Sequence, residues 1–274
     1  MIDPGFAPAK VNLTLHVTGK RADGYHLLDS LVAFADVGDH LRYDPADHLG
    51  LSVEGPMAAG VPVDDSNLVM KAGRWLNASG RGHLTLHKAL PAAAGIGGGS
   101  SDAAAALRLL SREWGMDVPQ GVAALGADVP VCMTPTAQRM SGVGEIVSPA
   151  PGLCPLPAVL VNPGVDVSTP QVFAALGRAD NPGMMNDLPI LRNPRVAIEW
   201  LGTCRNDLET PALELAPVIA EVLDALAASG AKLVRMSGSG ATCLGLFETI
   251  DAADCAAADL SHNPNWWVTP TILS

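Results

Sequence analysis

Positive charge is scarce in this chain of 274 residues. Lysine and arginine together number 17, against 28 aspartates and glutamates, so the formal net charge is −11 at pH 7. A general nucleic-acid-binding surface needs a basic face, and the composition therefore argues against a nucleic-acid partner. It does not exclude a nucleotide ligand, whose phosphates would be held by local donors and a metal ion rather than by the field of the whole protein.

Cysteines are few, and long apolar runs are missing. The chain has five cysteines, an odd number without a C-x-x-C pair, which predicts buried free thiols in a reducing compartment rather than a disulfide framework or a zinc site. Proline and glycine interrupt every apolar run before it reaches the roughly 18 residues of a membrane span. Residues 1–5 lack the basic and apolar segments of a signal peptide. We therefore expect a cytoplasmic protein with no membrane partner.

Aromatic residues are also rare, and one of them stands at a turn. The chain has two tyrosines and four phenylalanines, and Tyr25 follows the polar turn at residues 19–24. Such a tyrosine is able to stack on a planar base, but an amphipathic residue at the edge of a loop is the commoner case.

The remaining composition is that of a well-packed globular protein. Hydrophobic residues make up 48% of the chain and charged residues 16%, and the length suits one large or two medium domains of roughly 100–200 residues each. Three prolines, at positions 151, 155 and 157, mark a boundary between domains at residues 1–152 and 153–274. Predicted strands and helices are mixed on both sides of it, which indicates an α+β protein.

Periodicity predicts the main elements. Alternation over residues 11–17 predicts one half-buried strand, with Lys10, Asn12, Thr14 and His16 on one face. The spacing of Leu107, Leu110 and Trp114 predicts a helix with an apolar face. Further strands are expected at 27–37, 83–88, 158–161, 232–236, 244–247 and 267–269, and further helices at 68–76, 119–125, 168–176, 217–228 and 251–260. Residues 181–195 are expected to form a surface loop.

A glycine-rich loop at residues 90–102 joins a predicted strand to the alanine-rich helix. Glycines let backbone N–H groups close around an anion, and the helix N-terminus adds donors and a positive dipole end. Either Ser100 or Ser101 is a candidate helix cap, and Ser101 is also a candidate magnesium ligand. Taken alone, a phosphate site and a flexible glycine-serine turn are equally good interpretations.

The loop fits neither of two widespread nucleotide-binding patterns. A Walker A loop needs Gly-x-x-x-x-Gly-Lys-Ser/Thr, but around the Gly-Lys pair at 19–20 the chain has Thr14 and Arg21 at the flanking positions. A Rossmann fingerprint needs a final glycine where this chain has Ser100.

Several motifs together resemble the GHMP small-molecule kinases. The loop at 91–102 resembles the second motif of that family, and residues 238–242 resemble the third. Other segments are similar to one member whose substrate carries cytidine diphosphate: residues 8–13, 21–26, 126–130, 162–164 and 169–170. The resemblance extends from about Ala7 to Leu273. It implies an α+β, two-domain GHMP kinase fold, with an N-terminal domain like domain 2 of ribosomal protein S5, a ferredoxin-like C-terminal domain, and an active site in the cleft between them.

The resemblance also implies a reaction. It implies phosphoryl transfer from ATP, with Mg²⁺, to the 2-hydroxyl of 4-diphosphocytidyl-2-C-methyl-D-erythritol, in non-mevalonate isoprenoid biosynthesis, and it implies Lys10 and Asp128 as the catalytic pair. A carboxylate is able to accept the proton of the attacking alcohol, and an ammonium keeps that carboxylate ionised and stabilises developing charge. Local sequence alone would make Asp128 a turn or cap residue.

Binding residues follow from the same resemblance. Tyr25 and Phe173 would enclose the cytosine, His26 would hydrogen-bond to it, Asn12 would lie near the reacting hydroxyl, and Thr169 would contact the substrate. The role of Asp102 stays open, because a carboxylate near phosphates is repelled unless a cation intervenes. ATP would be bound by Pro91, Ala92, Ala93, Ala94, Gly95, Ile96, Gly97, Gly98, Gly99, Ser100 and Ser101, with Asn67 and Lys88 near the adenine or ribose.

Two alternatives remain open. One is another GHMP kinase, acting on homoserine, mevalonate or a sugar, although a pair of aromatic side chains for a base would serve no purpose with a small aliphatic substrate. The other is a catalytically silent nucleotide-binding protein, against which the presence of both Lys10 and Asp128 argues. The expected partners are small molecules, and the expected assembly is a monomer or a weak homodimer.

Overall fold

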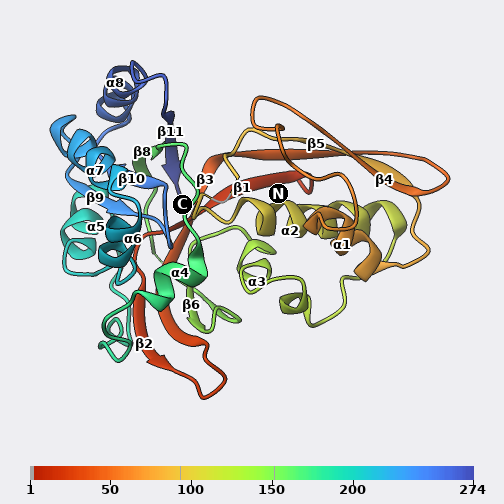
Figure 1. The fold of residues 1–274 in the computed structure, drawn as a ribbon, viewed down its shortest axis with the longest axis horizontal. Coiled ribbons are helices and arrows are strands. Elements are labelled where there is room, and N and C mark those ends of the chain that lie inside the picture. Colours follow the sequence, from red (N-terminus) through yellow and green to blue (C-terminus); the bar gives the residue numbers. More distant parts are fainter. Residues whose placement is uncertain (1–2, 93, 151) are drawn as a thin grey trace. The chain divides into compact units, whose positions relative to one another are not determined.

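The computed structural model describes residues 3–92, 94–150 and 152–274, and Figure 1 shows its helices and strands. Ala93 of the glycine loop and Pro151 of the predicted boundary lie outside the described residues. The strands are β1 (Phe6–Asn12), β2 (His16–Lys20), β3 (His26–Asp44), β4 (Leu49–Glu54), β5 (Gly82–His87), β6 (Gln138–Gly142), β7 (Ile146–Pro149), β8 (Leu156–Asn162), β9 (Leu233–Met236), β10 (Cys243–Leu246) and β11 (Trp267–Leu273). The helices are α1 (Leu68–Leu76), α2 (Gly98–Trp114), the 3-10 turn η1 (Val122–Ala124), α3 (Val129–Cys132), α4 (Thr169–Ala174), α5 (Pro194–Leu201), α6 (Glu209–Leu215), α7 (Val218–Ala228) and α8 (Ile250–Leu260). This mixture confirms the predicted α+β class.

The chain divides into two compact units that interleave along the sequence. The first comprises Met1–Lys10, Val37–Ala92 and Gly97–Pro135. The second comprises Val11–Asp36, Ala93–Ile96 and Thr136–Ser274. β1 and β3 each contribute residues to both units, because each strand runs past a boundary. The division after residue 152 stays a prediction.

In the first unit, two helices pack together beside a small sheet. β4 pairs in parallel with β5, and β5 pairs antiparallel with the last part of β3. α1 packs against α2. The predicted apolar face of α2 is confirmed by the complete burial of Leu107 and Leu110. The alanines at 103–106 are also completely buried, so the backbone of α2 approaches its neighbours closely.

The second unit contains an antiparallel sheet with helices packed on it. Its strands follow the order β11, β8, β10, β9. α7 contacts β9 and β10, while α8 contacts β8 and β11. Their apolar side chains form one core, which includes Val159, Val161, Val222, Leu226 and Phe247. The predicted helix at 217–228 and the strands at 232–236 and 244–247 are therefore confirmed to within one residue.

The single strand predicted over residues 11–17 is wrong. β1 ends at Asn12 and β2 begins at His16. Between them, the N–H groups of Leu13 and Thr14 both donate to the carbonyl of Leu31, at 2.9 and 3.3 Å. Two successive donors on one acceptor interrupt the regular ladder, so the four polar residues predicted to share one face are divided between two strands and a break.

Other differences are smaller. The residues around the turn at 141–145 form a hairpin of β6 and β7, which the sequence did not predict beyond the turn itself. α5 begins at Pro194, at the end of the segment expected to be a loop, and Asn193 caps it by accepting from the N–H of Val196. The expected helix at 119–125 is only the 3-10 turn η1.

All five cysteines are free, as predicted. Only Cys132 and Cys243 are buried; Cys154 and Cys204 are partly exposed and Cys255 is exposed, so the expectation of buried thiols is wrong for three of them. Burial raises the pKa of the Cys132 thiol to about 12. Within the described ranges, no helix is both long enough and apolar enough to cross a membrane.

Candidate active site

Lys10 and Asp128 form an ion pair in the first unit. Lys10 Nζ donates to Asp128 Oδ2 at 2.8 Å, although 118 residues separate the two along the chain. The lysine is buried near the end of β1, whereas 34% of the Asp128 side chain is exposed. Asp128 stands at the N-cap position of α3, but its carboxylate makes no capping hydrogen bond. The carboxylate therefore faces the lysine and keeps access to solvent.

The N-terminus of α2 adjoins this pair. Gly97 is the N-cap residue, with φ 62°, and no side chain caps the helix, so the prediction of a cap by Ser100 or Ser101 is wrong. A Cβ atom on Gly97 would lie 3.1 Å from Lys10 Cβ. The first N–H groups of a helix have no acceptor within it, and the dipole there favours an anion. The N-terminus of α2 and Lys10 together offer donors and positive charge for a phosphate.

Ser101 does not fit the predicted role of magnesium ligand. Its side chain is completely buried, and its hydroxyl donates to the carbonyl of Pro8 at 2.7 Å. Among the described residues, no group of three or more histidines, cysteines, aspartates or glutamates is arranged to hold a metal ion. The described residues therefore offer no cluster of this kind.

Lys88 lies in a buried cluster with two aspartates. Its ammonium donates to Asp39 Oδ2 and to Asp102 Oδ2, the latter at 2.9 Å. Asp39 Oδ1 in turn accepts from the backbone N–H groups of Ala89 and Leu90, at 2.6 and 2.9 Å. Lys88 is thus the cation that offsets the charge of Asp102. Because Lys88 is buried, its predicted contact with adenine or ribose does not fit the structure.

The cluster carries an excess of negative charge. Burial, and to a lesser extent Asp39, raise the pKa of Asp102 to about 7, although Lys88 opposes the shift. Burial alone would lower the pKa of Lys88, but the two carboxylates raise it above its ordinary value. Asp102 Oδ1 is buried without a hydrogen-bond partner, which is less costly for a neutral carboxyl group than for a charged one.

Asn67 caps α1. Its Oδ1 accepts from the N–H of Val69 at 2.9 Å, and its Nδ2 donates to the carbonyl of Pro62 at 2.6 Å. Both polar ends of the side chain are therefore engaged within the chain. A contact of Asn67 with the nucleotide stays a prediction.

In the second unit, the two glycine-rich loops pack against each other. Thr242 N–H donates to the carbonyl of Ala94 at 3.1 Å, and Ser237 Oγ donates to the carbonyl of Gly95 at 3.0 Å. Gly95 has φ 72°, and a Cβ there would lie 2.6 Å from the carbonyl oxygens of Ser237 and Gly240. Only glycine fits this position. The loop at 237–242 therefore supports the backbone of residues 94–95, a role that sequence reasoning did not assign.

Asn12 presents an unused acceptor in the second unit. Its N–H donates to Ser237 Oγ at 3.1 Å, and its Nδ2 donates to Ser30 Oγ at 2.8 Å. The single hydroxyl hydrogen of Ser30 goes to the carbonyl of Thr14, so the Asn12 atom facing Ser30 must be the donor Nδ2. This leaves Asn12 Oδ1 buried and without a hydrogen-bond partner. The atom is suited to accept a hydrogen bond from an alcohol.

The predicted base-binding residues are only partly brought together. His26 and Phe173 stack with ring centroids 4.9 Å apart and an interplanar angle of 19°. Burial, and secondarily Lys20, lower the pKa of His26, which favours the neutral imidazole. Tyr25 is 64% exposed, and its partnership with Phe173 around a base stays a prediction. Thr169 Oγ1 lies 2.6 Å from Ser239 Oγ.

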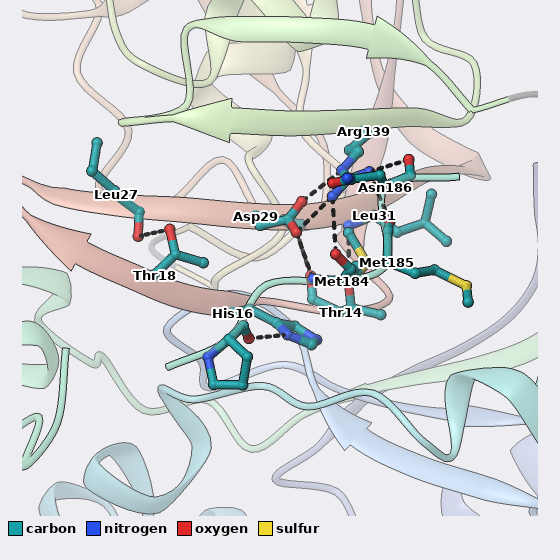
Figure 2. Close-up of polar contacts among 12 residues, drawn as sticks. Thr14, His16, Thr18, Leu27, Asp29, Leu31, Arg139, Met184, Met185 and Asn186 are labelled. Carbon is teal, nitrogen blue, oxygen red and sulfur yellow. Dashed lines mark hydrogen bonds and ion pairs between the residues drawn. The ribbon is translucent and has the colours of Figure 1, made fainter. Parts of the chain in front are cut away.

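Sequence reasoning missed a polar cluster that holds a loop on β3 (Figure 2). Arg139 donates to both oxygens of Asp29, at 2.7 and 2.8 Å. It also donates to the carbonyls of Met185 and Asn186, at 3.0 and 2.9 Å, while Met184 N–H donates to Asp29 Oδ2 at 2.6 Å. A charged residue within the apolar segment at 27–37 was the available signal, because a buried carboxylate requires a partner.

The same loop is fixed at its start by His16. Its Nε2 accepts from the N–H of Arg205 at 3.3 Å, so Nδ1 carries the proton and donates to the carbonyl of Pro182 at 3.2 Å. Burial lowers the pKa of His16, which favours this neutral tautomer. Residues 182–186 follow α4, which carries Phe173, and they are tied to β3, which begins with His26.

Comparisons with known proteins agree in one family. Residues 67–137 match the GHMP kinases N terminal domain and residues 195–264 match the GHMP kinases C terminal family. The chain is 60% identical to a 4-diphosphocytidyl-2-C-methyl-D-erythritol kinase of Dinoroseobacter shibae, over 98% of this chain and 94% of that protein. A crystal structure of a 4-(cytidine 5'-diphospho)-2C-methyl-D-erythritol kinase is similar with a TM-score of 0.81 and 35% identity, covering 98% of both chains. The fold is shared with L. major mevalonate kinase, which is 16% identical. The TM-score is 0.65, and the match covers 98% of this chain and 95% of that one.

Proposed function

The chain belongs to the GHMP kinase family, in the group of the 4-diphosphocytidyl-2-C-methyl-D-erythritol kinases, and from this membership we propose that it transfers the γ-phosphoryl group of ATP to the 2-hydroxyl of 4-diphosphocytidyl-2-C-methyl-D-erythritol. The reaction is a step of non-mevalonate isoprenoid biosynthesis. The observation that supports it most directly is the Lys10–Asp128 ion pair beside the N-terminus of α2.

Asp128 acts as the general base in this proposal. The 2-hydroxyl oxygen attacks the γ-phosphorus, the bond from that phosphorus to the oxygen of ADP breaks, and the hydroxyl proton passes to the Asp128 carboxylate. The partial exposure of Asp128 leaves room for an approaching alcohol. Lys10 orients the carboxylate through its 2.8 Å hydrogen bond and stabilises negative charge on the phosphoryl oxygens.

The phosphates of ATP are bound by backbone donors in the proposal. The donors belong to residues 94–101 and to the first turn of α2, and the positive end of the helix dipole adds to them. Magnesium supplies charge neutralisation on the phosphates when it is bound. We propose that the ion enters the site together with ATP.

The cytidine substrate is selected by the second unit. Asn12 lies near the reacting 2-hydroxyl, whose own hydrogen goes to Asp128, and its otherwise unpartnered buried Oδ1 accepts a hydrogen bond from another hydroxyl of the same substrate. The cytosine stacks on the aromatic pair of His26 and Phe173, with Tyr25 on its opposite face. Thr169 lies close by in sequence at the start of α4 and contacts the substrate.

A substrate comparison tests this function against the other GHMP kinases. The purified protein is supplied with ATP and magnesium, and ADP formation is measured with the cytidine-diphosphate substrate, mevalonate or homoserine as acceptor. We expect turnover only with the cytidine-diphosphate substrate. Equal turnover with mevalonate or homoserine would sink the assignment. The monomeric or weakly dimeric state stays a prediction, which sedimentation velocity of the same sample would test.

A further inference from the structure

We propose that Arg108 is a positioning residue for the Lys10–Asp128 pair, because its guanidinium joins the start of β1 to the end of α3. This inference rests on the proposed kinase chemistry of the pair. Arg108 itself touches neither of the two side chains in any hydrogen bond or ion pair found among the described residues.

The two hydrogen bonds of Arg108 end on the elements that carry the pair. Arg108 Nη2 donates to the carbonyl of Phe6, the first residue of β1, at 2.7 Å. Arg108 Nη1 donates to the carbonyl of Cys132, the last residue of α3, also at 2.7 Å. Lys10 lies further along β1, and Asp128 is the N-cap of α3. One rigid, planar group therefore fixes the relative position of both elements.

α3 is short and is held by the burial of Val129, Val131 and Cys132, by the Lys10–Asp128 ion pair at its N-cap and by Arg108 at its C-terminus. It is a four-residue helix whose first turn is closed by the hydrogen bond from Cys132 N–H to the carbonyl of Asp128 at 3.3 Å. Carbonyls at a helix C-terminus lack partners within the helix, and a cation there is favoured by the dipole. Arg108 supplies both the donor and the charge. A displacement of Cys132 is transmitted to Asp128 through a single helical turn.

A second contact on the same face of α2 shows what Arg108 adds. Ser101 Oγ donates to the carbonyl of Pro8 at 2.7 Å. Ser101 and Arg108 are two helical turns apart, and Pro8 and Phe6 are alternate residues of β1, so both carbonyls point to the same edge of the strand. Ser101 thus joins α2 to β1 only. Arg108 extends this connection to α3, so it bridges the two elements that carry the catalytic residues.

The local chemistry indicates a purpose beyond packing. The guanidinium has no carboxylate partner among the described residues, and its Nε is buried without a hydrogen-bond partner. Burial accordingly lowers the pKa of Arg108. Burying a charge whose hydrogen-bond acceptors are two neutral carbonyls costs free energy. A shorter polar side chain would bond to only one of these carbonyls, whereas the rigid guanidinium bonds to both and fixes the distance between them.

The test compares Arg108→Met, Arg108→Lys and a control, Arg112→Met. Arg112 lies one turn further along α2, is largely exposed, and pairs only with its neighbour Glu113 among the described residues. We expect Arg108→Met to lower kcat by about 10- to 100-fold, because displacements near 1 Å cost up to that factor. The KM values for ATP and for the acceptor should stay within twofold. Arg108→Lys should fall between Arg108→Met and the wild type, and Arg112→Met should match the wild type.

A double-mutant cycle separates positioning from general structural damage. In a chain that already carries Asp128→Asn, Arg108→Met should lower the residual kcat by less than twofold, because no base remains to be positioned. A loss of the same factor in both backgrounds would overturn the proposal, as would an unchanged kcat in a folded Arg108→Met protein. If Arg108→Met does not fold, Arg108→Gln and Arg108→Lys enter the same cycle with the same expectation. If the substrate comparison shows that another alcohol is the acceptor, the same cycle is measured with that alcohol. An error in the proposed substrate is therefore detected separately from an error in the proposed role of Arg108.

Discussion

Lys10 Nζ, from β1, lies 2.8 Å from Oδ2 of Asp128, the N-cap residue of α3. Replacement of Asp128 by Asn keeps the shape of the side chain and removes its ability to take a proton. We expect kcat to fall by roughly 10²- to 10⁴-fold, the usual contribution of a general base. The affinity for ATP, measured by calorimetry with a non-hydrolysable analogue, should change by less than about threefold, since loss of one general base does not remove the phosphate donors. An Asp128→Asn protein with wild-type turnover would remove this residue as the base.

Gly97 is held against the same lysine. Its φ of 62° belongs to the left-handed region, and an added Cβ would lie 3.1 Å from Lys10 Cβ and 3.3 Å from Lys10 Cε. We expect Gly97→Ala to lower the free energy of unfolding by about 1–3 kcal/mol through backbone strain, and also to lower kcat because the lysine stem must shift. Urea denaturation and steady-state kinetics measure the two effects.

Gly99→Ala is the matched control for stability. Gly99 lies in the first turn of the same helix, without a positive φ, and a Cβ there would meet its nearest neighbour at an ordinary 3.6 Å from Leu68 Cδ1. We expect no loss of stability. Equal destabilisation by both substitutions would show that the loop tolerates no side chain anywhere, and that the strain at Gly97 is not the cause.

Tyr25 is expected to contribute to substrate binding and not to folding. It is 64% exposed, so Tyr25→Ala should leave the melting temperature unchanged. If its ring stacks on the cytosine, the loss is roughly 1–3 kcal/mol, which raises the KM for the cytidine substrate by about 5- to 150-fold. The KM for ATP serves as the internal reference and should not change. A parallel rise in both KM values, or no rise in either, would contradict stacking by Tyr25.

Phe173→Ala should behave differently, because Phe173 already stacks on His26 without a ligand. Its removal loses a contact of the folded chain as well as one face of the base site. We expect a lower melting temperature together with a higher KM for the cytidine substrate. A change in the melting temperature alone would assign Phe173 to the fold and leave the base site to other residues.

Local patterns were sufficient for elements whose signals are local. The alternation before the glycine loop predicted β5, and the helix predicted at 68–76 has the bounds of α1. The break between β1 and β2 was not predictable in the same way, because it depends on the carbonyl of Leu31 in another strand. Alternating residues continue through the break, so periodicity alone favoured one strand.

The contacts of the candidate site that join distant parts of the chain were likewise not predictable from local patterns. The spacing of residues gave no reason to pair Lys10 with Asp128, and only the resemblance to GHMP kinases paired them. Ser101 was a candidate magnesium ligand because it follows the phosphate loop, and Lys88 was placed near the nucleotide by the resemblance. In the folded chain Ser101 donates to the carbonyl of Pro8, and Lys88 donates to two buried carboxylates. A residue type near a motif does not reveal which way its side chain points, and burial decides that direction.

The cluster of Lys88 with Asp39 and Asp102 makes stability depend on pH. The pKa of Asp102 is raised to about 7 in the folded protein, from 3.8, so the folded state holds this proton more tightly than the unfolded state. The resulting stabilisation is complete below about pH 4 and is lost as the pH rises towards 7 and slightly beyond. At 1.36 kcal/mol for each pH unit, the loss is at most roughly 4 kcal/mol. The thiol of Cys132, whose pKa burial raises to about 12, stays neutral throughout this range.

Asp102→Asn replaces the carboxyl group by a neutral amide of the same shape and should remove this dependence. We expect the substitution to raise the free energy of unfolding at pH 8 by about 1 kcal/mol or more, because the amide carries no charge to bury, and to have little effect below about pH 4. Urea denaturation across this range measures the difference, and Asp47→Asn, at an exposed loop position, is the control. A stabilisation that is the same at every pH would mean that Asp102 keeps its charge in the folded protein. Its ion pair with Lys88 would then outweigh the burial of a second carboxylate beside Asp39.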